Sequence, residues 1–379
     1  MKYLLFFLLI IIPFTGKAQI QISGQISDEF GFSISDVLVY IDGSSISTYS
    51  DVDGKFLLEI SDGNYNLVFR KENYQKQFLS VHSSEENLKI QMKETAISLD
   101  EALIVGMSEE DWKYYFEIFK QNFLGRNQAA QQCEILNPKV VKFRYDEENK
   151  KITASSKAPI EIENNYLGYK LEYDLVEFYI DYQTNYTYMA GTVLFSEMQG
   201  SKSKQKRWNK NREESYYGSI MHFMRALYNQ KLKENGFIIN RLIREENPDY
   251  AKFQENLKKM RDSGQRITIE SPPPKIIQKL IKAEVPYDSL LVKSQNQVFI
   301  NFDGLYDVEF INEKEDLDYA KSNGQQLVGN QVSVIQLIGD KFVEIAPNGN
   351  FYPPADFLTE GYFTWEKNAN LLPLDYEPE

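Results

Sequence analysis

Residues able to bind a metal or act as nucleophiles are scarce in this sequence. Of its 379 residues, two are histidines, His82 and His222, and one is a cysteine, Cys133. Structural zinc sites use four ligands drawn mainly from Cys and His, so a multi-His or Cys-rich zinc site is excluded, and a lone cysteine forms no internal disulfide. Neither histidine is near Cys133 in sequence to act as its base, and a buried structural thiol is therefore expected.

Carboxylates are abundant, with 55 Asp+Glu against 42 Lys+Arg and a formal net charge of −13. Paired carboxylates can hydrolyse glycosidic bonds, but a sequence does not show which of them converge, so the catalytic residues stay unknown. The sequence contains no G-x-x-x-x-G-K-[ST], G-x-G-x-x-G, G-x-S-x-G or H-E-x-x-H motif, which removes the nucleotide-binding, α/β-hydrolase and zincin classes. We expect neither a cofactor nor a metal.

The most conspicuous charged segment is residues 201–212, SKSKQKRWNKNR, which contains no acid. Its cations could contact anionic lipid headgroups, lipopolysaccharide phosphates or an acidic partner. A nucleic-acid partner is excluded by the acidic overall charge. The alternative is a solvated loop that leads into a helix from Arg212 to Gly236. The candidate contact residues are Lys202, Lys204, Lys206, Arg207, Trp208, Lys210 and Arg212.

The first eighteen residues have the layout of a secretory signal peptide. Lys2 precedes an uncharged apolar run from Tyr3 to Phe14, and Gly16 and Ala18 place small residues before a cleavage site at Gln19. A membrane anchor is the competing interpretation, but the run is shorter than the roughly 20 apolar residues that span a bilayer. We therefore expect an exported protein that is periplasmic or associated with the outer membrane.

Residues 19–92 are predicted to form a small all-β module. Apolar side chains alternate along short segments, such as Val37, Val39 and Ile41, and turn residues such as Asp42-Gly43 separate the segments. Several strands of this kind in about 75 residues predict a sandwich or small barrel. The turn at Asp51-Val52-Asp53-Gly54 has its glycine too early for an EF-hand loop, so a hairpin turn is expected rather than an ion site.

An ordered series of short motifs in this module resembles the carboxypeptidase regulatory-like domain, a transthyretin-like seven-stranded sandwich. The motifs are Gly24-x-Ile26-x-Asp28-x-x-Gly31, Asp36-x-x-Val39-x-Ile41, Ser50-Asp51-x-Asp53-Gly54-x-Phe56 and Gly63-x-Tyr65-x-Leu67-x-Phe69. The resemblance implies a fold rather than an activity, because such modules accompany peptidases, outer-membrane receptors and adhesins. No zinc carboxypeptidase site is expected on this chain.

Residues 93–107 are expected to be a linker or a seam strand. The segment Leu99–Gly106 resembles the one that follows the same module in TonB-dependent receptors. The rest of the chain is too short, and too helical, for a receptor barrel.

Residues 108–379 are predicted to form a larger α+β domain of unknown function with antiparallel sheet. Ser108 begins a helix that ends at Gly125, and a further helix is expected over Asp249–Asp262. Hairpins are expected around Asp303-Gly304 and between residues 332–337 and 341–345. The segment from Glu360 to Tyr376 resembles the tail of uncharacterised exported bacterial proteins that carry the same module, which implies no activity.

The sequence thus predicts an envelope protein of two parts that acts as a non-enzymatic binding or assembly scaffold for an envelope protein or glycan. Contact with a membrane would be peripheral. Two alternatives stay open: a carboxylate-dependent hydrolase of envelope glycan or peptide, and an accessory subunit of an outer-membrane receptor.

Overall fold

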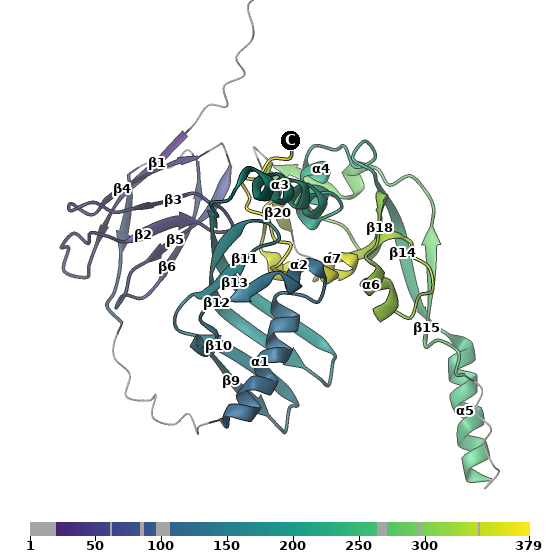
Figure 1. The fold of residues 1–379 in the computed structure, drawn as a ribbon. Helices are drawn as coiled ribbons and strands as arrows, with labels where there is room; N and C mark the ends of the chain where they lie inside the picture. The colour runs from purple at the N-terminus through teal and green to yellow at the C-terminus, as the bar shows by residue number, and fades with distance from the viewer. Residues whose placement is uncertain are drawn as a thin grey trace, which may run out of the picture. The chain divides into compact units, whose positions relative to one another are not determined.

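The computed structural model describes residues 20–60, 63–83, 87–95, 107–263, 271–294, 297–339 and 342–379. The chain forms two compact units (Figure 1), residues 1–42 with 46–99, and residues 43–45 with 100–379. The expected signal peptide, and residues 96–106 of the expected linker, lie outside the described residues.

The N-terminal unit is a seven-stranded sandwich, as the sequence predicts. One sheet has the order β4-β1-β7 and the other β3-β2-β5-β6. Alternate residues from both sheets, including Ile22, Val39, Leu58 and Phe69, fill one core. The strands are β1 (Ile20–Ser27), β2 (Leu38–Ile41), β3 (Ser47–Tyr49), β4 (Lys55–Ile60), β5 (Asn64–Arg70), β6 (Gln77–His82) and β7 (Leu88–Gln91).

The Asp51–Gly54 segment is a turn closed by its own side chain. Asp51 Oδ1 accepts hydrogen bonds from the backbone N–H groups of Asp53 (3.0 Å) and Lys55 (2.8 Å). Gly54 has φ +75°, and a Cβ there would lie 2.3 Å from the carbonyl oxygen of Ile26. Glycine is therefore required by both conformation and space.

The second unit begins with helix α1 (Glu109–Phe123), which packs on a six-stranded antiparallel sheet. The short helix α2 (Gln128–Gln131) follows α1. The sheet has the order β8-β11-β12-β10-β9, with β13 paired to the other side of β12. Phe119 and Phe123 of α1 are buried against it. The strands are β8 (Cys133–Ile135), β9 (Val141–Asp146), β10 (Lys151–Ser156), β11 (Ile160–Asn164), β12 (Tyr169–Asp181) and β13 (Tyr186–Glu197).

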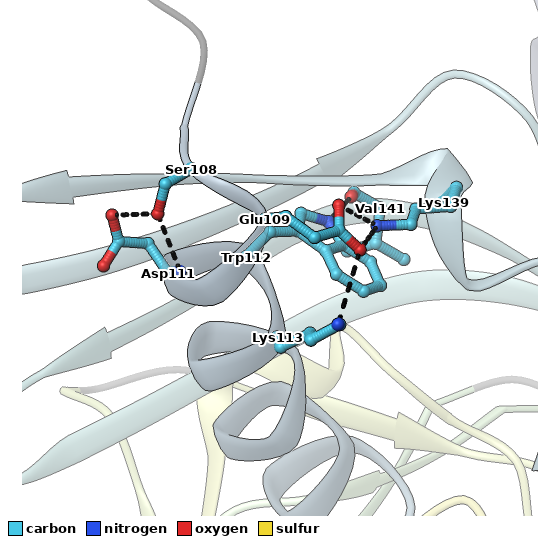
Figure 2. Close-up of polar contacts among 7 residues, drawn as sticks. All are labelled: Ser108, Glu109, Asp111, Trp112, Lys113, Lys139 and Val141. Atoms are coloured by element: carbon cyan, nitrogen blue, oxygen red, sulfur yellow. Dashed lines mark hydrogen bonds and ion pairs between the residues drawn. The ribbon is translucent and has the colours of Figure 1, made fainter.

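Helix α1 starts at the predicted cap (Figure 2). Ser108 Oγ accepts a hydrogen bond from Asp111 N at 3.0 Å. Lys139 Nζ lies 2.8 Å from the Glu109 carboxylate and 3.6 Å above the ring of Trp112. These contacts join the first turn of α1 to the segment that enters β9.

The remainder of the second unit contains two further antiparallel sheets that enclose a second core. Their orders are β15-β14-β18-β19-β22 and β16-β17-β20-β21. The helices are α3 (Lys202–Tyr216), α4 (Ile220–Tyr228), α5 (Pro248–Asp262), α6 (Leu317–Ser322) and α7 (Tyr362–Trp365). The strands are β14 (Phe237–Glu246), β15 (Ile276–Ile281), β16 (Leu291–Ser294), β17 (Gln297–Ile300), β18 (Leu305–Lys314), β19 (Asn330–Leu337), β20 (Val343–Ile345), β21 (Phe351–Tyr352) and β22 (Phe357–Gly361).

Both hairpins predicted in this region are wrong, although the α+β class with antiparallel sheet is confirmed. Strands β17 and β18, on either side of Asp303-Gly304, belong to different sheets, and so do β19 and β20. Val298 and Ile300 of one sheet pack in the same core as Val308 and Phe310 of the other. The Asp-Gly turn carries the chain from one layer to the facing layer, and turn chemistry alone does not distinguish this corner from a hairpin.

Candidate functional site

The basic segment 201–212 is a helix rather than the expected loop, and helix α3 starts ten residues before Arg212. Ser201 caps it by accepting a hydrogen bond from Lys204 N. The run contains a single large apolar residue, so it shows no apolar periodicity. The high helix propensity of Lys, Arg and Gln was the signal that could have identified it.

Trp208 points into the protein and anchors α3. It is 2% exposed, and its Nε1 donates to the carbonyl oxygen of Asn165 at 3.0 Å. Gly168 (φ +75°) and Gly200 lie against the ring, where a Cβ would approach Trp208 to 2.2 and 2.6 Å respectively. Trp208 thus packs inside the protein, and its part in contacting an anionic partner stays a prediction.

Arg212 is also directed inward, and its guanidinium is occupied by protein groups. Arg212 as a whole residue is 9% exposed. Its Nε donates to Leu167 O at 2.8 Å, and its Nη1 pairs with Glu197 Oε1 at 2.9 Å. The guanidinium carbon lies 3.9 Å from the ring centroid of Tyr169, a cation–π distance. Arg212 thus joins α3 to β12 and β13.

The five other candidate contact residues are exposed on α3. Lys210 pairs with Glu214 at 3.0 Å. Within the described parts of the chain, Lys202, Lys204, Lys206 and Arg207 have no ion-pair partner. Whether they contact an anionic partner stays a prediction.

A cavity of about 480 Å³ lies beside the inward face of α3. Positions 205, 208, 209 and 212 share one helical face, and all four line the cavity together with Tyr169 and Glu197 from the neighbouring strands. The remaining wall is formed by Ser45, Met198, Pro373, Asp375, Tyr376, Glu377 and Glu379. The lining combines aromatic rings with amide, carboxylate and guanidinium groups.

The C-terminal segment is held in the cavity wall by specific contacts. Asp375 accepts hydrogen bonds from the backbone N–H (2.8 Å) and the hydroxyl of Ser45. The buried guanidinium of Arg225 donates to the carbonyl oxygens of Leu374 (3.1 Å) and Tyr376 (2.9 Å). None of these residues was predicted, because they lie far apart in the sequence and no local motif marks them.

Both cavity tyrosines keep their protons at neutral pH. Burial raises the pKa of Tyr376 to about 12, with a further contribution from Glu213. Burial likewise raises the pKa of Tyr169, against the opposing charge of Arg212. The phenols are therefore available as neutral hydrogen-bond donors.

A second cavity, of about 390 Å³, gathers four carboxyl groups, those of Glu214, Glu313, Asp316 and Glu366. Burial raises the pKa of Glu366 to about 8, and Glu313 and Asp316 add to the effect. Burial also raises the pKa of Glu313 to about 7, with Gln331 opposing and Glu214 reinforcing the shift. At neutral pH Glu366 therefore keeps its proton, beside a Glu313 whose pKa lies near neutral.

Of the three groups that sequence analysis examined as metal ligand or nucleophile, His222 and Cys133 are buried, and His82 is half-buried at the end of β6. Burial lowers the pKa of His222 to about 4, and its ring lies 3.2 Å from Asn235 Oδ1. Burial raises the pKa of Cys133 to about 12, so the thiol stays protonated. Among the residues that the structure describes, no group of three or more His, Cys, Asp and Glu could hold a metal ion.

Comparison with protein families identifies the N-terminal unit. Residues 22–104 match the CarboxypepD_reg-like domain, a regulatory and non-catalytic domain, which confirms the resemblance seen in the sequence. The match covers about a fifth of the chain and leaves the larger region uncharacterised. A comparison with curated proteins gave no match.

Solved structures similar to this chain share little sequence with it. A cohesin–X-dockerin complex from Acetivibrio cellulolyticus is 19% identical and covers 26% of this chain and 72% of its own, with a TM-score of 0.20. A DUF3823 family protein from Bacteroides ovatus is 14% identical and covers 48% of this chain and 83% of its own, with a TM-score of 0.17. A Bacteroides fragilis protein of unknown function, described as a candidate membrane-associated protein, is 10% identical. It covers 86% of this chain and 94% of its own, with a TM-score of 0.16. None of these similarities identifies an enzyme family.

In the described ranges, no helix has the length and apolar character needed to cross a membrane.

Proposed function

We propose that this protein is an exported, non-enzymatic binding scaffold of the bacterial envelope, and that helix α3 and its cavity bind an acidic glycan. The observation that carries the proposal is the division of α3 into two faces. Trp208 and Arg212 fix the inner face to the sheet and line a cavity, while Lys202, Lys204, Lys206 and Arg207 stay exposed without ion pairs among the described residues.

The chemistry of the two faces fits a sugar that carries phosphate or carboxylate groups. Sugar hydroxyls both donate and accept hydrogen bonds, and the amides of Gln205 and Asn209 and the carboxylate of Glu197 offer both functions. In helical geometry Lys202 lies beside the lining face, and Lys204 and Lys206 flank it. Four cations that have no ion-pair partner among the described residues, in a chain of net charge −13, form a local site for anions.

Neutralising the four exposed cations is expected to weaken ligand binding at least tenfold without unfolding the protein. The variant is Lys202→Gln with Lys204→Gln, Lys206→Gln and Arg207→Gln, and the probe is the soluble phosphorylated core oligosaccharide of lipopolysaccharide, measured by titration calorimetry. Each lost charge contact weakens binding, and the remaining affinity should depend less on salt. The melting temperature should stay unchanged, because these side chains are exposed.

A matched control neutralises four cations on another exposed helix, α5. Lys252→Gln with Lys258→Gln, Lys259→Gln and Arg261→Gln should leave the affinity unchanged. A dephosphorylated oligosaccharide separates the contribution of the cations from that of the cavity. Equal affinity of the α3 variant and the wild type for the phosphorylated probe would contradict the proposal.

Export and the position of the domain boundary belong to the same proposal. The apolar run of residues 3–14 with its Gly16-x-Ala18 site supports cleavage before Gln19. A boundary within residues 93–107, between a module of residues 19–92 and a domain of residues 108–379, is supported by the alternation pattern and by the capped helix that begins at Ser108. Periplasmic or outer-membrane localisation follows from the export signal.

Hydrolysis by paired carboxylates is a second candidate function, which the Glu313–Glu366 cavity favours. A carboxyl group that stays protonated near pH 7 can donate its proton to a leaving oxygen while an ionised neighbour activates water. We expect any release of reducing ends from envelope glycan strands to fall at least a hundredfold in Glu366→Gln. The Glu255→Gln variant on α5 serves as control, and turnover that persists in Glu366→Gln would remove this cavity from consideration.

A further inference from the structure

Strand β15 forms one end of the five-stranded sheet and is exposed along its length. It pairs with β14 on one side, and no other strand of the described chain pairs with its outer side (Figure 1). Ile276 and Leu280 are 47% and 46% exposed. An exposed aliphatic edge strand is a template for pairing with another chain.

The hydrogen-bond phase of β15 identifies the backbone groups that face outward. Asn247 N donates to Lys275 O at 2.9 Å, in register with the β14–β15 ladder. In an antiparallel pair, alternate residues direct both backbone groups to the partner strand. Backbone N–H and C=O groups therefore point toward β14 at residues 275, 277, 279 and 281. They point outward at Ile276, Gln278 and Leu280.

We propose that two copies of this chain associate through β15, as antiparallel strands with Gln278 on the two-fold axis. Antiparallel pairing places outward residues opposite outward residues, so Gln278 can lie opposite the partner's Gln278. In this register, Ile276 lies opposite the partner's Leu280. The two five-stranded sheets then join as one continuous sheet. This inference is independent of the ligand proposed for α3.

The β15 sequence is self-complementary in this register. The aliphatic side chains of Ile276 and Leu280 pair twice across the axis, on the same face as the two Gln278 amides. Lys279 lies opposite the partner's Ile277, so no like charges meet. Lys279 is also neutralised within its own sheet, because its Nζ pairs with Glu245 at 2.6 Å. A two-fold interface requires this self-complementarity.

The experiment measures association of the mature full-length chain by light scattering after size exclusion, from about 1 to about 100 µM. The wild type should shift from monomer to dimer across this range. Gln278→Pro removes an N–H group that β14 does not use, and we expect it to weaken dimerisation at least tenfold with an unchanged melting temperature. Monomeric wild type at the highest concentration, or an unaffected Gln278→Pro dimer, would overturn the proposal.

Cysteine cross-linking tests the register itself. Opposed hydrogen-bonded residues have Cα atoms about 5.5 Å apart, within the roughly 4.4–6.8 Å that a disulfide spans. Gln278→Cys should therefore give a disulfide-linked dimer on mild oxidation. Lys279→Cys is the matched control on the adjacent exposed position and should stay uncrosslinked, because it lies opposite the partner's Ile277. Equal cross-linking of the two variants would contradict pairing centred on Gln278.

Discussion

Replacing Trp208 with alanine is expected to destabilise the second unit by about 3–5 kcal/mol, the usual cost of deleting a large buried aromatic side chain. The indole is 2% exposed and donates to Asn165 O. Gly168 and Gly200 lie against the ring, and neither glycine has a side chain that could fill the space. Alanine would leave a cavity between α3 and the sheet.

Urea unfolding followed by far-ultraviolet circular dichroism measures this loss. Trp208→Phe, which keeps a ring but loses the hydrogen bond, should lie between the wild type and Trp208→Ala. Lys206→Ala, two residues earlier and exposed, should change the free energy of unfolding by less than about 0.5 kcal/mol. A Trp208→Ala variant as stable as Lys206→Ala would show that the indole is not a packing anchor.

The contrast between Trp208 and Lys206 shows where prediction from the sequence ends. The density of positive charge in residues 201–212 was visible directly. The direction of each side chain was not, because Trp208 packs against glycines at positions 168 and 200 and donates to Asn165 O, and the sequence does not connect these residues to it. The residue types in this segment predicted an interaction site. Tertiary packing then placed some of these residues on the inner face of α3 and the others on its outer face.

The strands of the N-terminal unit were predictable because the pattern that specifies them lies in residues close together in the sequence. Alternation such as Phe56, Leu58 and Ile60 follows directly from the two-residue period of a strand, and two facing sheets are needed to bury it. The cap of α1 at Ser108 is likewise local. In the second unit, β17 and β18 belong to different sheets. The Asp303-Gly304 turn between them is compatible both with a hairpin in one sheet and with a corner between two sheets, so the turn residues do not decide which forms.

Neither cavity could be predicted, because each is assembled from distant segments. The acidic cavity combines Glu214 at the end of α3 with Glu313 on β18 and Glu366 after α7. The sequence contains 55 acidic residues and offers no means of choosing these among them. The raised pKa values of Glu313 and Glu366 arise from burial and from neighbouring carboxyl groups, which come together only after folding.

The ionisation of Glu366 is expected to cost the folded protein stability as pH rises from about 5 to above 8, and Glu366→Gln should remove this loss. Burial raises the pKa of Glu366 from an ordinary value of 4.5 to about 8 in the folded state. Below pH 4.5 the carboxyl is protonated in both states and contributes no difference. Between these values the unfolded state releases the proton and the folded state retains it, so each pH unit costs the folded state up to about 1.4 kcal/mol.

Glutamine imitates the protonated carboxyl and has no charge to release, so the variant should be stabilised relative to the wild type at pH 8.5 and nearly equal to it at pH 5. Urea unfolding at pH 5, 6.5 and 8.5 measures the difference. The Glu255→Gln control removes an exposed carboxylate whose pKa is lowered by its hydrogen bond to Lys259, and its stability should follow the wild-type pH dependence. Because Glu313 raises the pKa of Glu366, Glu313→Gln should make this loss of stability smaller and end it at a lower pH. An equal difference between Glu366→Gln and wild type at all three pH values would show that Glu366 ionises normally, and Glu366 would then hold no proton at neutral pH for catalysis.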